Sequence, residues 1–136
     1  MATLPMSDLI ETAKRVRGNA YAPYSGYRVG AAILDSSGQI WSGCNVENVS
    51  YGLCVCAERT ALCKMVSEGQ QELIAVAVVT KDGGTPCGMC LQSLLEFTKD
   101  PTRVDVITVS EQSNQVHYKL SDLIPHGFQT GDLKRT

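Results

Sequence analysis

The fold is decided by the stretch from residue 56 to residue 90, which reads CAERTALCKMVSEGQQELIAVAVVTKDGGTPCGMC. Apolar residues at helical spacing predict a helix over residues 56–67. The residues on its inner face are Ala57, Ala61, Leu62 and Met65. Residues 73–79 are all apolar, which predicts a strand in the middle of a sheet with both faces covered. A further helix is predicted over residues 87–98.

The N-terminal part of the chain adds one helix and two strands to this centre. Residues 8–17 have an amphipathic helical pattern, and Asp8 with Glu11 resembles a capping box at its start. Residues 29–34 and 40–46 have the pattern of two strands joined by a short turn.

The C-terminal part adds a strand over residues 104–109, a short strand over residues 116–118 and a helical turn over residues 120–124. The resulting order of elements is α-β-β-α-β-α-β-β. Strand-helix-strand alternation favours parallel neighbours joined by right-handed crossovers. We therefore predict an α/β fold, a three-layer α/β/α sandwich around a five-stranded mixed sheet, with residues 1–136 forming a single domain.

Composition and charge restrict the class of ligand. The 136 residues carry a net charge of -2, and no cluster of Lys or Arg stands out. A protein that binds nucleic acid through its phosphates needs a basic face, so no nucleic-acid partner is expected, whereas a nucleoside without phosphate stays possible. No signal peptide or membrane span is evident, and we expect a cytoplasmic protein with no membrane partner.

Six cysteines in so short a chain point to metal binding or catalysis, because disulfides are rare in a reducing cytosol. Cys56, Cys87 and Cys90 all stand where a loop becomes a helix, a position that favours the thiolate form. Three thiolates leave one corner of a tetrahedral zinc site open for water, which is typical of catalytic zinc. His117 and His126 lie in unrelated segments, so neither is an obvious fourth protein ligand. The other three cysteines, Cys44, Cys54 and Cys63, are interpreted as core thiols.

Glu58 follows Cys56 by two residues and is a candidate proton shuttle between the water and a substrate nitrogen. Each of these features has a common alternative explanation on its own. A lone C-x-x-C is more often a structural zinc or redox pair, and a glutamate in a first helical turn usually interacts with the helix dipole. The joint occurrence of C-A-E, an apolar strand and P-C-x-x-C favours the catalytic interpretation.

This combination resembles the signature of zinc-dependent deaminases that act on cytosine-type bases. More narrowly, the chain resembles the small homotetrameric cytidine deaminases, and the resemblance runs nearly from end to end. The segments that carry it are AYAPYS at 20–25, VGAA at 29–32, GCNVEN at 43–48, CAERTA at 56–61, PCG at 86–88 and LIP at 123–125.

The resemblance implies one Zn²⁺ per subunit held by Cys56, Cys87 and Cys90, with Glu58 as general acid and base. It also implies that the thiolates receive hydrogen bonds from Arg59. A zinc ion with three thiolates sums to one negative charge, and an arginine beside them would draw off part of it.

The resemblance also implies how the nucleoside is bound, in active sites at the subunit interfaces of a homotetramer. Asn45 and Glu47 would bind the ribose hydroxyls, and the backbone N–H of Ala57 would bind the pyrimidine O2. Tyr27 takes the place of an aromatic residue that packs near the base, and Phe128 would reach over the substrate of a neighbouring subunit.

One position departs from the family pattern, since Leu91 stands where an arginine is usual. Its helical spacing with Leu94 and Leu95 predicts that it joins an apolar face. The expected reaction is hydrolytic deamination of cytidine and 2′-deoxycytidine. A modified cytosine nucleoside or the antibiotic blasticidin S are alternative substrates, and a zinc-stabilised binding module without catalysis is the alternative from another class.

Overall fold

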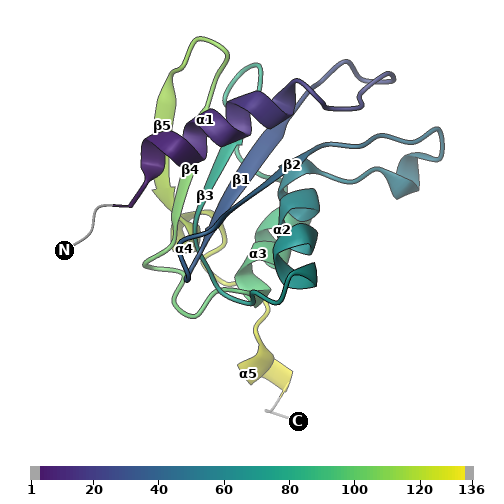
Figure 1. The fold of residues 1–136 in the computed structure, drawn as a ribbon. Helices are drawn as coiled ribbons and strands as arrows, with labels where there is room; N and C mark the ends of the chain where they lie inside the picture. Colours follow the sequence, from purple (N-terminus) through teal and green to yellow (C-terminus); the bar gives the residue numbers. More distant parts are fainter. Residues whose placement is uncertain (1–3, 134–136) are drawn as a thin grey trace.

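The computed structural model describes residues 4–133, and its centre is a five-stranded mixed sheet in the order β2-β1-β3-β4-β5 (Figure 1). The strands are β1 (Gly30–Asp35), β2 (Ile40–Cys44), β3 (Leu73–Val79), β4 (Asp105–Val109) and β5 (Gln115–Lys119). β3 and β4 are parallel, and the other neighbours are antiparallel. The apolar stretch at residues 73–79 is the central strand, so that prediction is confirmed.

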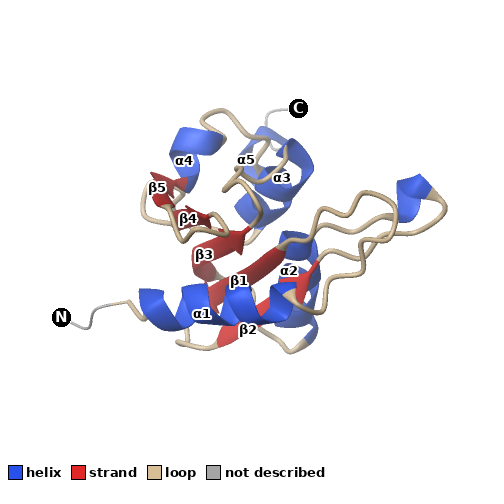
Figure 2. Ribbon diagram, turned by 90° about the horizontal axis from the view of Figure 1, so that it is seen from above, coloured by secondary structure: helices blue, strands red, loops and turns tan. Residues whose placement is uncertain are grey.

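Helices cover both faces of this sheet (Figure 2). α1 (Met6–Arg17) lies on one face, and α2 (Ala57–Ser67) and α3 (Gly88–Glu96) lie on the other. The predicted α/β/α sandwich is therefore confirmed. The short helices are η1 (Tyr51–Leu53), α4 (Leu120–Leu123) and α5 (Thr130–Leu133). No helix among residues 4–133 is both long and apolar enough to cross a bilayer.

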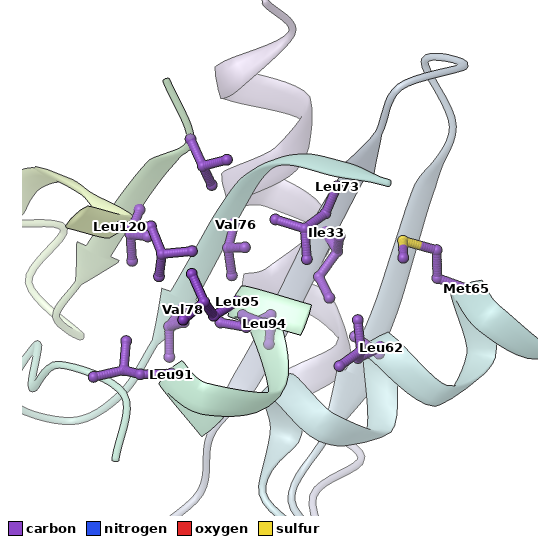
Figure 3. Packing of buried hydrophobic residues seen from close by; sticks show 14 of the residues in the cluster. Ile33, Leu62, Met65, Leu73, Val76, Val78, Leu91, Leu94, Leu95 and Leu120 are labelled. Atoms are coloured by element: carbon purple, nitrogen blue, oxygen red, sulfur yellow. The ribbon is translucent and has the colours of Figure 1, made fainter. Parts of the chain in front are cut away.

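The two faces of the sheet bury separate hydrophobic clusters. The cluster under α1 is made mainly of small and branched residues from β1, β3 and β4. The larger cluster lies between the sheet and the α2–α3 layer (Figure 3). Leu91 belongs to it and is 8% exposed, which confirms that this leucine joins an apolar face. The four residues predicted to face inward from α2 are all buried.

A close approach of two backbones fixes the start of α2 against the sheet. A Cβ atom at Gly43 of β2 would lie 2.4 Å from the backbone nitrogen of Ala61 and 2.7 Å from the carbonyl oxygen of Ala57. Only glycine fits such a contact without moving the helix. This strand therefore holds the first turn of α2, which carries Glu58, in a fixed place.

The ends of some elements differ from their predicted positions. α1 begins at Met6 rather than residue 8, with Pro5 as N-cap and no side-chain cap, so the capping box of Asp8 and Glu11 is wrong. Proline suits a helix start because a backbone N–H at that position would have no intrahelical acceptor, so proline loses no hydrogen bond there. β2 ends at Cys44 because Val46 leaves the sheet to exchange backbone hydrogen bonds of 2.9 Å with Val55. η1 and α5 were not predicted.

The interpretation of three cysteines as core thiols is also wrong. Cys63 is exposed, because it lies on the face of α2 opposite the buried residues. Cys44 and Cys54 are partly buried. Cys54 lines the cavity described below.

The β1–β2 turn depends on Asp35, whose buried carboxylate accepts hydrogen bonds from the Ser37 N–H and hydroxyl (2.8 and 2.6 Å), the Gln39 N–H (3.1 Å) and Trp41 Nε1 (2.7 Å). Burial alone would raise the pKa of Asp35, but the bonds from Ser37, Trp41 and Gln39 outweigh it and lower that pKa. Asp35→Ala leaves these donors without their acceptor. We expect it to lower the free energy of unfolding by about 2–4 kcal/mol in urea denaturation.

Asp100→Ala is the matched control for this prediction. Asp100 closes a similar turn by accepting bonds from the N–H and hydroxyl of Thr102 (3.0 and 2.6 Å), but it is exposed. Water can replace those bonds, so a much smaller change is expected. Equal losses in the two variants would contradict the role given to the buried Asp35.

Candidate active site

Three thiols meet where α2 and α3 begin. Cys56 is the N-cap of α2, Cys87 is the N-cap of α3, and Cys90 lies in the first turn of α3. The Sγ atom of Cys87 is 3.9 Å from that of Cys56 and 3.5 Å from that of Cys90, and all three lie within 4.8 Å of one another. The prediction that these cysteines come together is consistent with this geometry.

The spacing of the sulfurs fits a tetrahedral zinc ion. Zn–S bonds of about 2.3 Å at tetrahedral angles place two sulfurs about 3.8 Å apart. The two distances above bracket that value. Within residues 4–133, the group of possible metal ligands contains these three cysteines alone. A zinc ion held by them keeps a fourth position for a non-protein ligand, as in catalytic sites.

The electrostatics of the cluster also favour a cation. Hydrogen bonding to Cys90, followed by Arg59 and Cys87, lowers the pKa of Cys56 to about 5. The Arg59 Nη2 atom donates to the Cys56 sulfur at 3.7 Å, a contact consistent with what the resemblance implies for this arginine. The same closeness raises the pKa of Cys90, because a second thiolate would face the first. A divalent cation removes this conflict and allows all three thiolates.

Glu58 is placed beside the thiols and hidden from solvent. Its side chain is 4% exposed in the first turn of α2. Burial raises the pKa of Glu58 to about 6, and the charge of Cys56 adds to the effect. A carboxyl group with such a pKa can both accept and release a proton near neutral pH.

A cavity of about 360 Å³ opens beside Glu58 and the cysteines. Its volume suits a small ligand. The predicted residues Tyr27, Asn45, Glu47 and Ala57 all belong to its wall. The rest of the lining is Ser25, Val29, Cys54, Val55, Cys56, Glu58, Val78, Thr80, Gly84, Thr85, Pro86 and Cys87. Ala57 is the first residue of α2, so its backbone N–H has no acceptor within the helix.

Asn45 and Glu47 also hold the loop before β1. Asn45 accepts a hydrogen bond from the Val29 N–H and donates one to the Tyr27 carbonyl, both at 2.8 Å. Glu47 accepts from the N–H groups of Tyr24 (3.0 Å) and Ser25 (3.1 Å) and from the Ser25 hydroxyl. Both side chains keep unused hydrogen-bonding capacity for a ligand, since an amide and a carboxylate each offer further positions.

Phe128 is the predicted site residue that lies apart from the others. It is 58% exposed, between α4 and α5, and does not line the cavity of its own chain. The side chain of Gln92 in α3 donates to the Phe128 carbonyl (2.7 Å) and accepts from the Phe128 N–H (3.1 Å). Sequence analysis missed this contact, because a side chain bound to a distant backbone leaves no pattern in the sequence.

Comparison with known proteins gives the family. The sequence profile of the "Cytidine and deoxycytidylate deaminase zinc-binding region" matches residues 5–107. The chain belongs to this family. It is 42% identical over 127 residues to a cytidine deaminase of Halalkalibacterium halodurans, covering 92% of this chain and 95% of the relative. It is 41% identical over 125 residues to a cytidine deaminase of Mycobacterium tuberculosis, covering 90% and 89%.

Solved structures agree with these sequence relatives. The fold superimposes on the crystal structure of cytidine deaminase from Burkholderia pseudomallei with a TM-score of 0.84 and 43% identity, covering 90% of this chain and 98% of that one. Cytidine deaminase from Mycobacterium tuberculosis gives a TM-score of 0.79 at 38% identity. This deaminase is therefore a member of a zinc-binding enzyme family, and its three cysteines form a group positioned to hold the metal.

Proposed function

We propose that this deaminase hydrolyses cytidine and 2′-deoxycytidine to uridine and 2′-deoxyuridine with release of ammonia, a reaction of pyrimidine salvage. The observation that carries the proposal is the placement of Glu58, a buried carboxyl group on the wall of a nucleoside-sized cavity, beside three thiols at metal-binding distances. The relatives that match about nine-tenths of this chain are cytidine deaminases.

The thiols of Cys56, Cys87 and Cys90 would hold one Zn²⁺, which when bound acidifies water for attack. Glu58 would accept one proton from the attacking water and deliver it to ring N3 of cytosine, so that C4 becomes electrophilic and the water oxygen bonds to it. Glu58 would then take the remaining proton of that oxygen and give it to the amino group, so that the C4–N bond breaks, ammonia leaves and C4 becomes a carbonyl carbon. Arg59 would draw charge from the thiolates through its hydrogen bond to Cys56.

The cavity wall supplies groups for the rest of the nucleoside. Asn45 and Glu47 would bind the ribose hydroxyls, using a donor and an acceptor that a sugar can match. The free N–H of Ala57 would bind the pyrimidine O2. The ring of Tyr27 would pack near the base.

The proposed assembly is a cytoplasmic homotetramer of single-domain subunits with no nucleic-acid or membrane partner. Phe128 is exposed, its backbone is bound by Gln92, and it does not line the cavity of its own chain. These observations support a contribution of Phe128 to the site of a neighbouring subunit. Measurement of the molar mass by light scattering tests the tetramer, and a monomer with full activity would exclude the role given to Phe128.

The alternative functions differ in the substrate that the cavity would bind. A modified cytosine nucleoside would still use the ribose-facing pair, whereas blasticidin S carries a different sugar. Asn45 and Glu47 on the cavity wall therefore favour plain nucleosides. A non-catalytic zinc module would leave the buried Glu58 and the fourth metal position without a use.

The test follows the loss of cytidine absorbance with the zinc-loaded protein, before and after treatment with a chelator. Conversion to uridine with stoichiometric ammonia, lost on chelation and restored by zinc, is the expected result. A folded, zinc-containing protein that converts none of cytidine, 2′-deoxycytidine, 5-methylcytidine and blasticidin S would support the binding module instead.

A further inference from the structure

A hydrogen bond joins two segments of the cavity wall that lie far apart in the sequence. The hydroxyl of Tyr27 donates to Asp82 Oδ1 at 2.7 Å. Burial and this bond raise the pKa of Tyr27, and the same bond lowers the pKa of Asp82. The donor therefore stays protonated and the acceptor stays ionised around neutral pH, which is the stronger kind of hydrogen bond.

Asp82 belongs to the segment that runs from β3 to the metal-binding helix. The buried Thr80 donates to Asp82 Oδ1 at 3.2 Å and accepts from the N–H groups of Gly83 (2.7 Å) and Gly84 (3.1 Å). The Gly84 N–H also reaches Asp82 Oδ1 at 3.3 Å. These bonds make residues 80–84 one hydrogen-bonded turn, which only Thr85 and Pro86 separate from Cys87.

Tyr27 is itself held firmly on the other side. Its N–H donates to the Ser25 hydroxyl at 2.9 Å, and its carbonyl accepts from Asn45 at 2.8 Å. Tyr27 thus stands between the loop anchored by Asn45 and the turn at residues 80–84. The hydrogen bond from its hydroxyl to Asp82 joins the loop to the turn, and a phenylalanine in its place could not make that bond.

We propose that the Tyr27 hydroxyl and Asp82 are positioning groups that hold the turn at residues 80–84, and with it the cavity wall up to Cys87, in the form that binds the nucleoside. This inference rests on the proposed deaminase function and goes beyond the role of the Tyr27 ring near the base. Gly84, Thr85 and Pro86 form that wall. None of the groups in the link needs to touch the reacting atoms.

A loosened wall has a defined kinetic effect. If only a fraction of the molecules has the wall in place, the apparent affinity is the intrinsic affinity multiplied by that fraction, while the bound complex reacts as before. Because the bond is exposed and water can replace part of it, we expect Tyr27→Phe and Asp82→Ala each to raise the KM for cytidine about twofold to fivefold, with kcat within about twofold of wild type. A contribution to stability alone would lower Tm without raising KM.

The experiment is a double-mutant cycle on the zinc-loaded protein. If the link is the cause, the double variant is no worse than the more damaged single variant. Asp82→Asn keeps an oxygen that can accept the same bond and should recover most of the wild-type KM. The matched control is Tyr118→Phe on β5. This substitution removes a hydroxyl that makes no hydrogen bond within residues 4–133 and does not belong to the cavity wall.

A second readout needs no turnover, namely the rate at which zinc passes to a coloured chelator. Because the turn leads into Cys87, this rate should rise in Tyr27→Phe and Asp82→Ala and stay unchanged in Tyr118→Phe. Absence of turnover in the wild type would reject the proposed function and leave this readout to judge the link. Unchanged zinc release together with an unchanged KM, or effects that simply add in the double variant, would overturn the proposal.

Discussion

Glu58→Gln is expected to lower kcat for cytidine by a factor on the order of 10³–10⁴ while the protein keeps its zinc. The glutamine has nearly the same shape but can neither accept nor release the proton that the reaction moves. Folding should suffer little, because Glu58 is 4% exposed and its raised pKa shows that the site already disfavours the charged form. Turnover, zinc content and Tm measured on one preparation check the three parts of this expectation.

Glu68→Gln is the matched control. Glu68 is an exposed glutamate at the C-terminal end of the same helix, so its variant makes the same chemical change far from the thiols. It should keep wild-type kcat, zinc and Tm. Turnover of Glu58→Gln within tenfold of wild type would reject Glu58 as the proton shuttle, and loss of its zinc would mean that the carboxylate supports the metal site.

Much of the fold follows from local pattern. Residues 73–79 are apolar on both faces, and only the centre of a covered sheet accommodates such a strand. Helical periodicity identified the inner face of α2, and the two loop-to-helix transitions identified where the cysteines stand. The resemblance added the substrate-facing residues, and four of the five line one cavity.

The error at Cys63 is local, because the helical periodicity of α2 already places this thiol opposite the buried residues. The missed contacts, in contrast, join segments that lie far apart in the sequence. The link from Tyr27 to Asp82 spans 55 positions. The contact of Gln92 with the Phe128 backbone spans 36. Periodicity describes one element at a time, so it carries no information on which polar side chains meet after folding.

Cys90→Ala is expected to remove both zinc and activity. Structural zinc in peptides binds with about 10–16 kcal/mol at four ligands, or roughly 3–4 kcal/mol for each. Loss of one thiolate should therefore weaken zinc binding by on the order of 10²–10³-fold. Cys90 is fully buried, and within residues 4–133 the group of possible metal ligands offers no fourth residue to take its place.

The stability of the variant gives a second measure of the same site. A bound ion stabilises a folded protein according to its concentration and affinity, so chelation should lower the Tm of the wild type. In Cys90→Ala, where little zinc is bound, the chelator should change Tm far less. The control is Cys63→Ala, which removes an exposed thiol from α2 outside the cluster. It should keep one zinc per chain and the full response to chelator, whereas stoichiometric zinc in Cys90→Ala would reject the three-cysteine site.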